Sequence, residues 1–218
     1  MTETVIVSGA GDYADPWHRF AATSRRLATL LESCGHTVAV RDDVDKALAG
    51  PGECDLLVVN IGNPSQPRPL PVIEAINAGL KGHLAAGGSL LGIHVAATSL
   101  TQLASWSEIL GGRWIRGHTM HPPQGNARIL IGDAHPVTSG LSDFDIFDER
   151  YSYLRVEPGI AVLAEHLHDG IRHPVTWAHE VAGARVAYDG LGHDAASYDS
   201  PGHVALLTRT ARWLLRDL

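Results

Sequence analysis

A single histidine stands where an α/β enzyme would be expected to carry its nucleophile. Residues 89–97 have the pattern of an apolar strand, a Gly92-Ile93-His94 turn and the start of a helix. This layout is typical of a nucleophile elbow, a sharp turn that lifts one side chain out of the end of a sheet. Because His94 replaces serine or cysteine there, we expect proton transfer or metal binding by an imidazole.

Histidine is frequent in the chain as a whole, with 13 residues against 17 lysines and arginines together. His121 precedes a proline, Glu149 follows an aspartate, and His193 follows a glycine near the end of the chain. Together with His94, these residues could supply two or three imidazoles and one carboxylate. Such a set suits Zn²⁺, Mn²⁺ or Fe²⁺ with an open coordination position, and without a metal it remains an acid/base set.

We therefore predict His94, His121, Glu149 and His193 as catalytic residues. His94, His121 and Glu149 are the expected ligands if a divalent metal is bound. His118 lies close to His121 in the sequence and competes with it for the same role. The proline after His121 favours His121, and His118 is assigned to substrate binding.

The pattern of apolar segments indicates the elements that would position these residues. Strands are expected at residues 4–8, 37–40, 55–61 and 89–95, and helices at 17–34, 70–86 and 99–110. This alternation predicts a doubly wound, mostly parallel sheet. Short strand-like runs follow at 127–131, 144–147, 161–167, 175–178 and 184–188, and a last helix begins after Ser200. They predict some antiparallel strands in the C-terminal half of one domain, residues 1–218.

Composition narrows the possible partners. The net charge of -7 argues against binding to nucleic acid or to an anionic membrane, and no apolar run is long enough to span a bilayer. Cys34 and Cys54 form neither a metal-binding spacing nor a disulfide framework. The first residues have no pattern of a signal peptide, so a cytoplasmic location is expected. A homodimer is expected only because dimers are common.

Six motifs occur in an order that resembles the ThuA-like family of trehalose-utilisation proteins. They are Gly92-Ile93-His94, Gly111-Gly112-Arg113-Trp114 with His121-Pro122 after it, His135-Pro136-Val137-Thr138, Asp148-Glu149-Arg150-Tyr151, Pro174-Val175-Thr176-Trp177 and Gly192-His193. The resemblance implies a flavodoxin-like fold of the class I glutamine amidotransferase-like superfamily, without the amidotransferase cysteine. It also implies a part in the metabolism of trehalose or of keto-sugars made from it.

A sugar or keto-sugar is thus the expected ligand. Loops that follow parallel strands meet at the carboxyl edge of the sheet, and the rings of Trp17, Trp114 and Trp177 could cover the C–H face of a sugar. The residues predicted to bind substrate are Asp12, Tyr13, Asn60, Trp114, His118, Tyr151 and Trp177. Four further histidines fall at roughly alternating positions in the strand-like runs of the second half. They are predicted to lie on the surface: His166, His168, His173 and His179.

Two functions remain open at this point. The first is an enzyme of carbohydrate metabolism, of the lyase, isomerase or hydrolase type, that uses His/Glu acid-base chemistry with or without a divalent metal. The alternative is a non-catalytic protein that binds a sugar or has a regulatory role. Glutamine amidotransfer is excluded, because its thiolate would have to stand at position 94.

Overall fold

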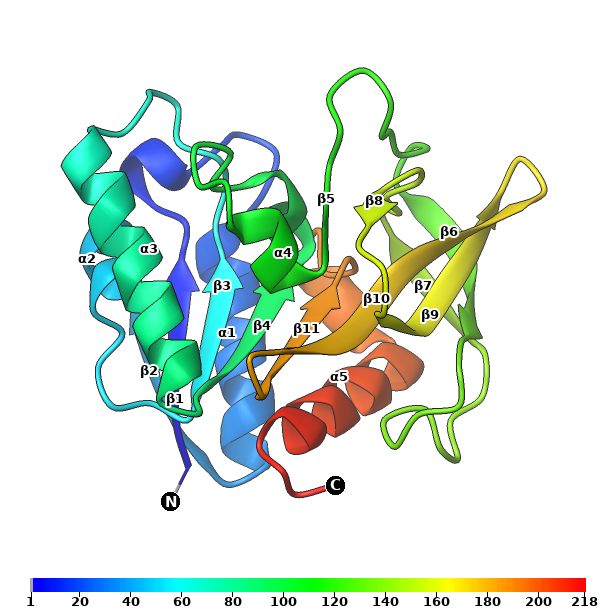
Figure 1. Ribbon diagram of the computed structural model, residues 1–218. Helices are drawn as coiled ribbons and strands as arrows, with labels where there is room; N and C mark the ends of the chain where they lie inside the picture. The colour runs from blue at the N-terminus through cyan, green and yellow to red at the C-terminus, as the bar shows by residue number, and fades with distance from the viewer. Residues whose placement is uncertain (1) are drawn as a thin grey trace.

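A nine-stranded sheet forms the centre of the structure, a computed structural model that describes residues 2–218 (Figure 1). In spatial order the strands are β2 (His36–Arg41), β1 (Thr2–Ser8), β3 (Leu56–Asn60), β4 (Ser89–Ile93), β11 (Ala184–Asp189), β10 (Ile171–Val181), β9 (Ala161–His168), β6 (Gly125–Ile131) and β7 (Phe144–Asp148). The first five run parallel, and each later pairing is antiparallel. The predicted fold class is therefore confirmed.

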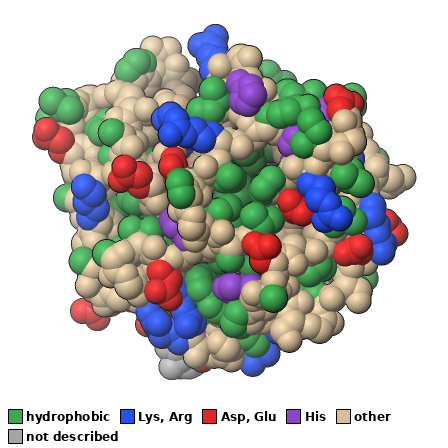
Figure 2. Space-filling view, turned by 45° about the vertical axis from the view of Figure 1, so that its right-hand side comes forward, with side chains coloured by type: hydrophobic (Ala, Val, Ile, Leu, Met, Phe, Trp, Pro, Cys, Tyr) green, Lys and Arg blue, Asp and Glu red, His purple; other side chains and the backbone are tan. Residues whose placement is uncertain are grey.

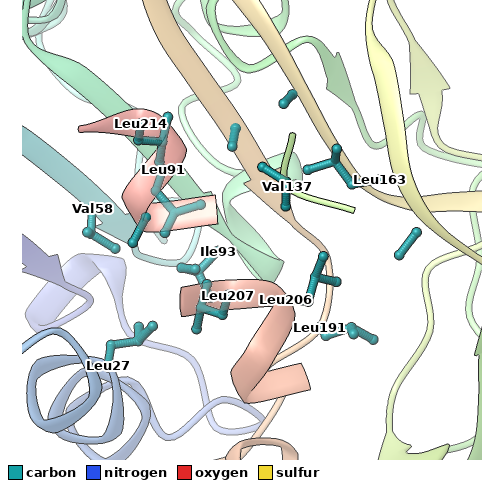
Figure 3. Packing of buried hydrophobic residues seen from close by; sticks show 14 of the residues in the cluster. Leu27, Val58, Leu91, Ile93, Val137, Leu163, Leu191, Leu206, Leu207 and Leu214 are labelled. Atoms are coloured by element: carbon teal, nitrogen blue, oxygen red, sulfur yellow. The ribbon is translucent and has the colours of Figure 1, made fainter. Parts of the chain in front are cut away.

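Helices cover both faces of the parallel strands. One face packs against α1 (Phe20–Ser33) and α5 (Pro201–Leu214), and the other against α2 (Val44–Ala49), α3 (Leu70–Ala85) and α4 (Trp106–Leu110). Successive side chains of a strand point to opposite faces. Val58 and Leu91 accordingly join Leu27 in the first core, shown in Figure 3, while Leu57 and Leu90 join the second. This two-sided burial explains why β3 and β4 are almost entirely apolar.

Some local predictions differ from the structure. The helix expected at residues 99–110 is shortened to α4, and the preceding turn is the 3₁₀ helix η2 (His94–Thr98). Leu100 adopts a left-handed φ of 52°, which cannot continue an α-helix. The short helix α2 was not expected. Its six residues are too few to show a periodic pattern, and it is held by burial of Val44 and Leu48.

Smaller elements complete the fold around the carboxyl edge of the sheet. They are η1 (Gly11–Tyr13), η3 (Ala195–Asp199) and the two-stranded sheet of β5 (Gly112–Arg113) and β8 (Arg155–Val156). Acidic and basic side chains are interspersed on the face shown in Figure 2, without a patch of one sign. Within residues 2–218, every helix is too short or too polar to cross a membrane.

Candidate functional site

The turn after β4 fixes His94 in an unusual backbone conformation. His94 has a φ of 40°, in the region that residues other than glycine rarely adopt. Space is also tight two residues earlier, because a Cβ at Gly92 would lie 2.4 Å from the end of the Leu110 side chain in α4 and 3.3 Å from the Ala96 Cβ in η2. The Tyr188 hydroxyl donates to the His94 carbonyl at 2.8 Å. This elbow therefore holds a buried imidazole rather than an exposed nucleophile.

A single hydrogen bond sets the tautomer of His94. Its Nδ1 lies 2.7 Å from the Gly190 carbonyl oxygen, which only accepts, so Nδ1 carries the proton. Nε2 then keeps its lone pair and accepts from Nδ1 of His193 at 3.4 Å, and Oε2 of Glu149 lies 3.3 Å from the same nitrogen. Tyr151 stacks on the imidazole, with ring centres 4.3 Å apart. The imidazole therefore carries its lone pair on Nε2, and the bond to Gly190 and the stacked Tyr151 ring hold its orientation.

Glu149 is the carboxylate at the middle of the site, directly after β7. Its Oε2 also lies 3.4 Å from Nδ1 of His193, and its Oε1 lies 2.9 Å from Nδ1 of His121. Burial acts to raise the pKa of Glu149, but its contacts with the His193 and His94 imidazoles hold it well below its usual range. The side chain is therefore a buried carboxylate surrounded by imidazoles. His193 gains from the same pairing, which raises its pKa.

His18 joins the site from the loop after β1 and was not predicted from the sequence. Both carboxylate oxygens of Asp15 lie 2.8 Å from Nδ1 of His18, so Nδ1 donates and Nε2 is left with its lone pair. That Nε2 is buried and has no hydrogen-bond partner. Burial and the neighbouring His94 lower the pKa of His18 to about 4. The signal in the sequence was the Asp15-x-x-His18 spacing behind the first strand.

Four side chains bring ligand atoms to one point. One atom each from His18, His94, Glu149 and His193 lies within 4.8 Å of the other three. This separation fits a common ion, because metal–ligand bonds of about 2 Å allow donor atoms up to about 4 Å apart after small adjustments. The four candidate ligands thus differ from the three expected from the sequence. His121 binds the other Glu149 oxygen and lies outside the group, and His18 and His193 take part instead.

A cavity of about 630 Å³ opens above this group. Its walls include His121, Glu149, Tyr151, His193 and three further side chains, Trp17, His18 and Trp114. The Trp114 ring stands edge-on to Tyr151 at 4.8 Å, and Trp17 is 73% exposed. The predicted residues His121, Glu149, Tyr151, His193 and Trp114 therefore share one cavity, with His94 buried at its base.

Two residues predicted to bind substrate lie in a separate network. Asp12 forms an ion pair with Arg68 at 2.6 Å. The Tyr13 hydroxyl donates to Asp45 at 2.6 Å, and Arg68 also pairs with Asp45. Burial and Asp45 raise the pKa of Tyr13. This network braces the loop after β1, and neither Asp12 nor Tyr13 lines the main cavity.

Three other predicted substrate residues are also placed elsewhere. The Asn60 amide donates to the hydroxyls of Thr23 and Ser24 below the site. Trp177 is buried in the core, where its indole N–H donates to the Leu110 carbonyl. His118 packs near Tyr153, with ring centres 5.7 Å apart, and does not line the cavity. All three were chosen for their place in the sequence, which does not reveal which way a side chain points.

A larger hollow of about 730 Å³ lies at the opposite edge of the sheet. The one histidine in its lining is His83, whose Nε2 donates to the Ser89 carbonyl. Nδ1 of His83 lies 3.9 Å from the Cys54 thiol. Burial raises the pKa of that thiol to about 11, so it is not a ready nucleophile. Among the described residues that line this hollow, no group of imidazoles and carboxylates like that at the carboxyl edge occurs.

The fold and the site together define a class: an α/β protein with a flavodoxin-like order of parallel strands and a His/Glu group at the carboxyl edge of the sheet. A family model described as "ThuA: Trehalose utilisation" matches residues 7–214. The chain belongs to the ThuA family, and the resemblance found in the sequence is confirmed.

Solved structures agree on the fold. A ThuA-like protein from Parabacteroides merdae superposes with a TM-score of 0.80 at 19% identity, over 98% of this chain and 90% of that one. One from Bacteroides uniformis gives 0.73 at 17% identity, over 98% and 91%. A β-galactosidase from Rahnella sp. R3 contains a similar unit, with a TM-score of 0.64 and 17% identity, over 98% of this chain but 31% of the galactosidase. A search of curated proteins gives no significant match.

Proposed function

We propose that this protein is an enzyme of carbohydrate metabolism that moves a proton on a sugar or keto-sugar, using a divalent metal ion bound by His18, His94, Glu149 and His193. One observation carries the proposal. Four ligand atoms converge at the base of a cavity, and the tautomers of His18 and His94 leave the lone pairs of their Nε2 atoms available there. Carbohydrate is favoured as the substrate class because the family is named for trehalose utilisation.

The charges around the site favour a cation. Asp148 and Glu149 are both buried carboxylates. None of the described residues that line the cavity is a lysine or arginine. Desolvation of a buried charge is costly, and a divalent ion beside Glu149 would supply a further counter-charge. Imidazole and carboxylate ligands suit Zn²⁺, Mn²⁺ or Fe²⁺.

The hydrogen-bond acceptors behind the histidines support the same assignment. Histidine ligands commonly donate their second N–H to a carboxylate or a backbone carbonyl, which fixes the ring. His18 donates to Asp15 and His94 donates to the Gly190 carbonyl. Each acceptor is held within the fold rather than in solvent, so the imidazoles are oriented before any ligand arrives.

Roles for the chain's own groups follow from this geometry. When bound, the ion would polarise the carbonyl or hydroxyl oxygen of the substrate. His121 is the group best placed to exchange a proton, because its ring is 41% exposed at the cavity and is oriented by Oε1 of Glu149. Trp114 and Trp17 offer flat apolar faces for the C–H side of a sugar ring.

The test begins with the metal content of the purified protein. Wild type is expected to contain close to one equivalent of Zn, Mn or Fe after purification without chelators, and His94→Ala to contain almost none. His118→Ala is the control, since His118 neither lines the cavity nor belongs to the ligand group, and it should keep the metal. Activity would then be measured on keto-sugars and disaccharides with each metal restored.

Each outcome separates the proposed functions. Turnover that needs both the metal and His94 supports the enzyme. A protein that binds metal and sugar but converts no substrate would instead be the non-catalytic sugar-binding alternative. Failure of the wild-type protein to bind any of the three metals, with unchanged activity in chelator, would contradict the metal-dependent proposal.

A further inference from the structure

We infer that the buried pair of Asp189 and His203 is a positioning device that holds the loop 190–193, and through it the donor atoms of His94 and His193, in place. The inference rests on the proposed metal centre for its main readout. Neither residue touches the cavity, and neither belongs to the ligand group. His203 lies in the first turn of α5, and Asp189 is the last residue of β11.

His203 is held as an imidazolium by its two hydrogen bonds. Its Nε2 lies 2.8 Å from Oδ2 of Asp189, and its Nδ1 lies 3.0 Å from the Ser197 carbonyl oxygen. A carboxylate and a carbonyl only accept, so both ring nitrogens must donate. Burial alone would lower the pKa of His203, but the Asp189 carboxylate raises it to about 9. A completely buried cation therefore lies beside the end of β11.

The second oxygen of Asp189 controls where the chain goes next. Oδ1 accepts from the backbone N–H of Leu191 at 3.0 Å and from the Thr176 hydroxyl at 3.2 Å. The bond from Leu191 fixes Gly190, the residue between Asp189 and Leu191 in the chain. The Gly190 carbonyl in turn accepts from Nδ1 of His94. The tautomer and tilt of His94 therefore depend on a carboxylate that does not contact His94.

Asp148 holds the far end of the same loop. Its carboxylate accepts from the backbone N–H groups of Gly192 at 2.8 Å and His193 at 3.2 Å. It also accepts from the N–H of Glu149 at 2.8 Å. The loop is thus fixed at its start by Asp189 and at its end by Asp148. Displacement of Asp189 would move the Gly190 carbonyl and, through Gly192, the His193 ring.

A purely structural role for the pair would have a different signature. A buried ion pair often adds little net stability, because desolvation offsets the attraction between the charges. If the pair served only the fold, its loss would change the free energy of unfolding but not the metal affinity of molecules that remain folded. If the pair positions the ligand atoms, its loss should lower the metal affinity of folded molecules by more than the change in the free energy of unfolding can explain.

The experiment compares His203→Gln with His83→Gln. Both histidines are buried and donate to a backbone carbonyl, but His83 lies at the opposite edge of the sheet. Zinc affinity would be measured on folded protein by competition with a chromophoric chelator. We expect His203→Gln to weaken binding about 10–100-fold, as for other partners behind metal ligands. His83→Gln should change it less than twofold.

A second readout needs no metal. In long-range ¹H–¹⁵N NMR spectra of the metal-free protein, the Nδ1–H of His94 should give a resolved signal from its bond to Gly190. His203→Gln should shift or broaden that signal, and His83→Gln should not. If wild type binds no zinc, the proposed metal centre fails, but this measurement still tests the positioning role.

A milder variant covers the case in which His203→Gln does not fold. Thr176→Val keeps the shape of the side chain and removes only the hydroxyl bond to Asp189. It should weaken zinc binding several-fold and shift the same His94 signal to a smaller extent. Unchanged zinc affinity and an unchanged His94 signal in a folded His203→Gln or Thr176→Val variant would overturn the inference.

Discussion

Two groups of three histidines lie in this molecule, with similar spacing and very different chemistry. The first group is His18, His94 and His193 at the carboxyl edge of the sheet. The second is His166, His168 and His173 on the β9–β10 hairpin. Ring centres in the first group are 4.8–5.4 Å apart, and two of the pairs in the second are 5.4 and 6.2 Å apart. Proximity of imidazoles alone therefore does not distinguish a candidate site from histidines that only pack in the fold.

The difference lies in where the nitrogen lone pairs point. In the second group, Nε2 of His166 donates to the Tyr151 carbonyl, and Nδ1 of His173 accepts from the Tyr153 N–H. The nitrogens are thus directed at separate backbone groups. In the first group, a carboxylate lies between the rings, and acceptors behind His18 and His94 turn the free nitrogens inward. Converging lone pairs with a shared carboxylate, rather than a count of histidines, define the candidate centre.

The largest effect is expected from removing that carboxylate. Glu149→Gln should weaken metal binding at least about 100-fold, since removing one charge from a buried set costs about 3–5 kcal/mol. The control is Glu165→Gln, which removes a carboxylate beside the second group that pairs with Arg172. Chelator competition on both variants would measure the contrast. Equal metal affinity in the two variants would remove the distinction between the groups.

The second prediction concerns stability against pH. Burial lowers the pKa of His166 in the folded protein from the ordinary 6.5 to about 4. Between these two values the unfolded chain binds a proton that the folded protein does not. The contribution of neutral His166 to stability is therefore present above pH 6.5 and is lost as the pH falls toward 4. His203, with its pKa raised to about 9 although burial opposes this, contributes below pH 6.5 and loses that contribution as the pH rises through 9.

Each change should be of the order of 3 kcal/mol in the free energy of unfolding, from about 1.4 kcal/mol per pKa unit. Urea unfolding across pH 4–10 would measure it, with His166→Gln and His203→Gln as controls. In a plot of the free energy of unfolding against pH, His166→Gln should reduce the fall toward acid pH. His203→Gln should reduce the fall toward alkaline pH. If His203→Gln instead leaves the fall toward alkaline pH unchanged, His203 is not a buried cation.

The third prediction compares the carboxylates beside one histidine of each group. Asp15→Asn should weaken metal binding about 10–100-fold, because the amide orients His18 less firmly and removes charge behind it. Asp169→Asn is the matched control, as Asp169 lies 3.6 Å from Nε2 of His168. Isothermal titration with zinc would compare them. A weaker effect of Asp15→Asn than of Asp169→Asn would argue against His18 as a ligand.

The smallest effect on the proposed centre should come from the second group itself. His173→Gln removes the acceptor of the Tyr153 N–H, so the free energy of unfolding should fall by about 1–2 kcal/mol. Metal affinity should stay within twofold of wild type. Loss of metal from this variant would mean that the two groups act as one.

Much of the site could be predicted because its residues follow strands. His94 comes after β4, Glu149 after β7 and His193 soon after β11. All three strands end at the same edge of the sheet, since β7 runs in the same direction as β11 through the intervening antiparallel pairs. Order along the chain and strand polarity were therefore enough to bring these residues together.

The remainder depended on tertiary contacts that the sequence does not display. His18 lies in an irregular loop, and its lone pair is directed by Asp15 rather than by any periodic pattern. The alternation in β9 and β10 suggested surface histidines, which is wrong for His166 and His173, since both are buried. Residues 150–154 cover that face of the hairpin, as the bonds from His166 to Tyr151 and from Tyr153 to His173 show.

The left-handed backbone at His94 implies a conflict between stability and activity. A side chain at φ 40° carries a conformational cost of about 1–3 kcal/mol that glycine would avoid. His94→Gly should therefore leave a more stable fold than His94→Ala, although both lack the imidazole. Selection for thermal resistance alone would drive this position toward glycine and discard the proposed centre. Position 94 is thus where engineering for robustness would most easily cost the protein its chemistry.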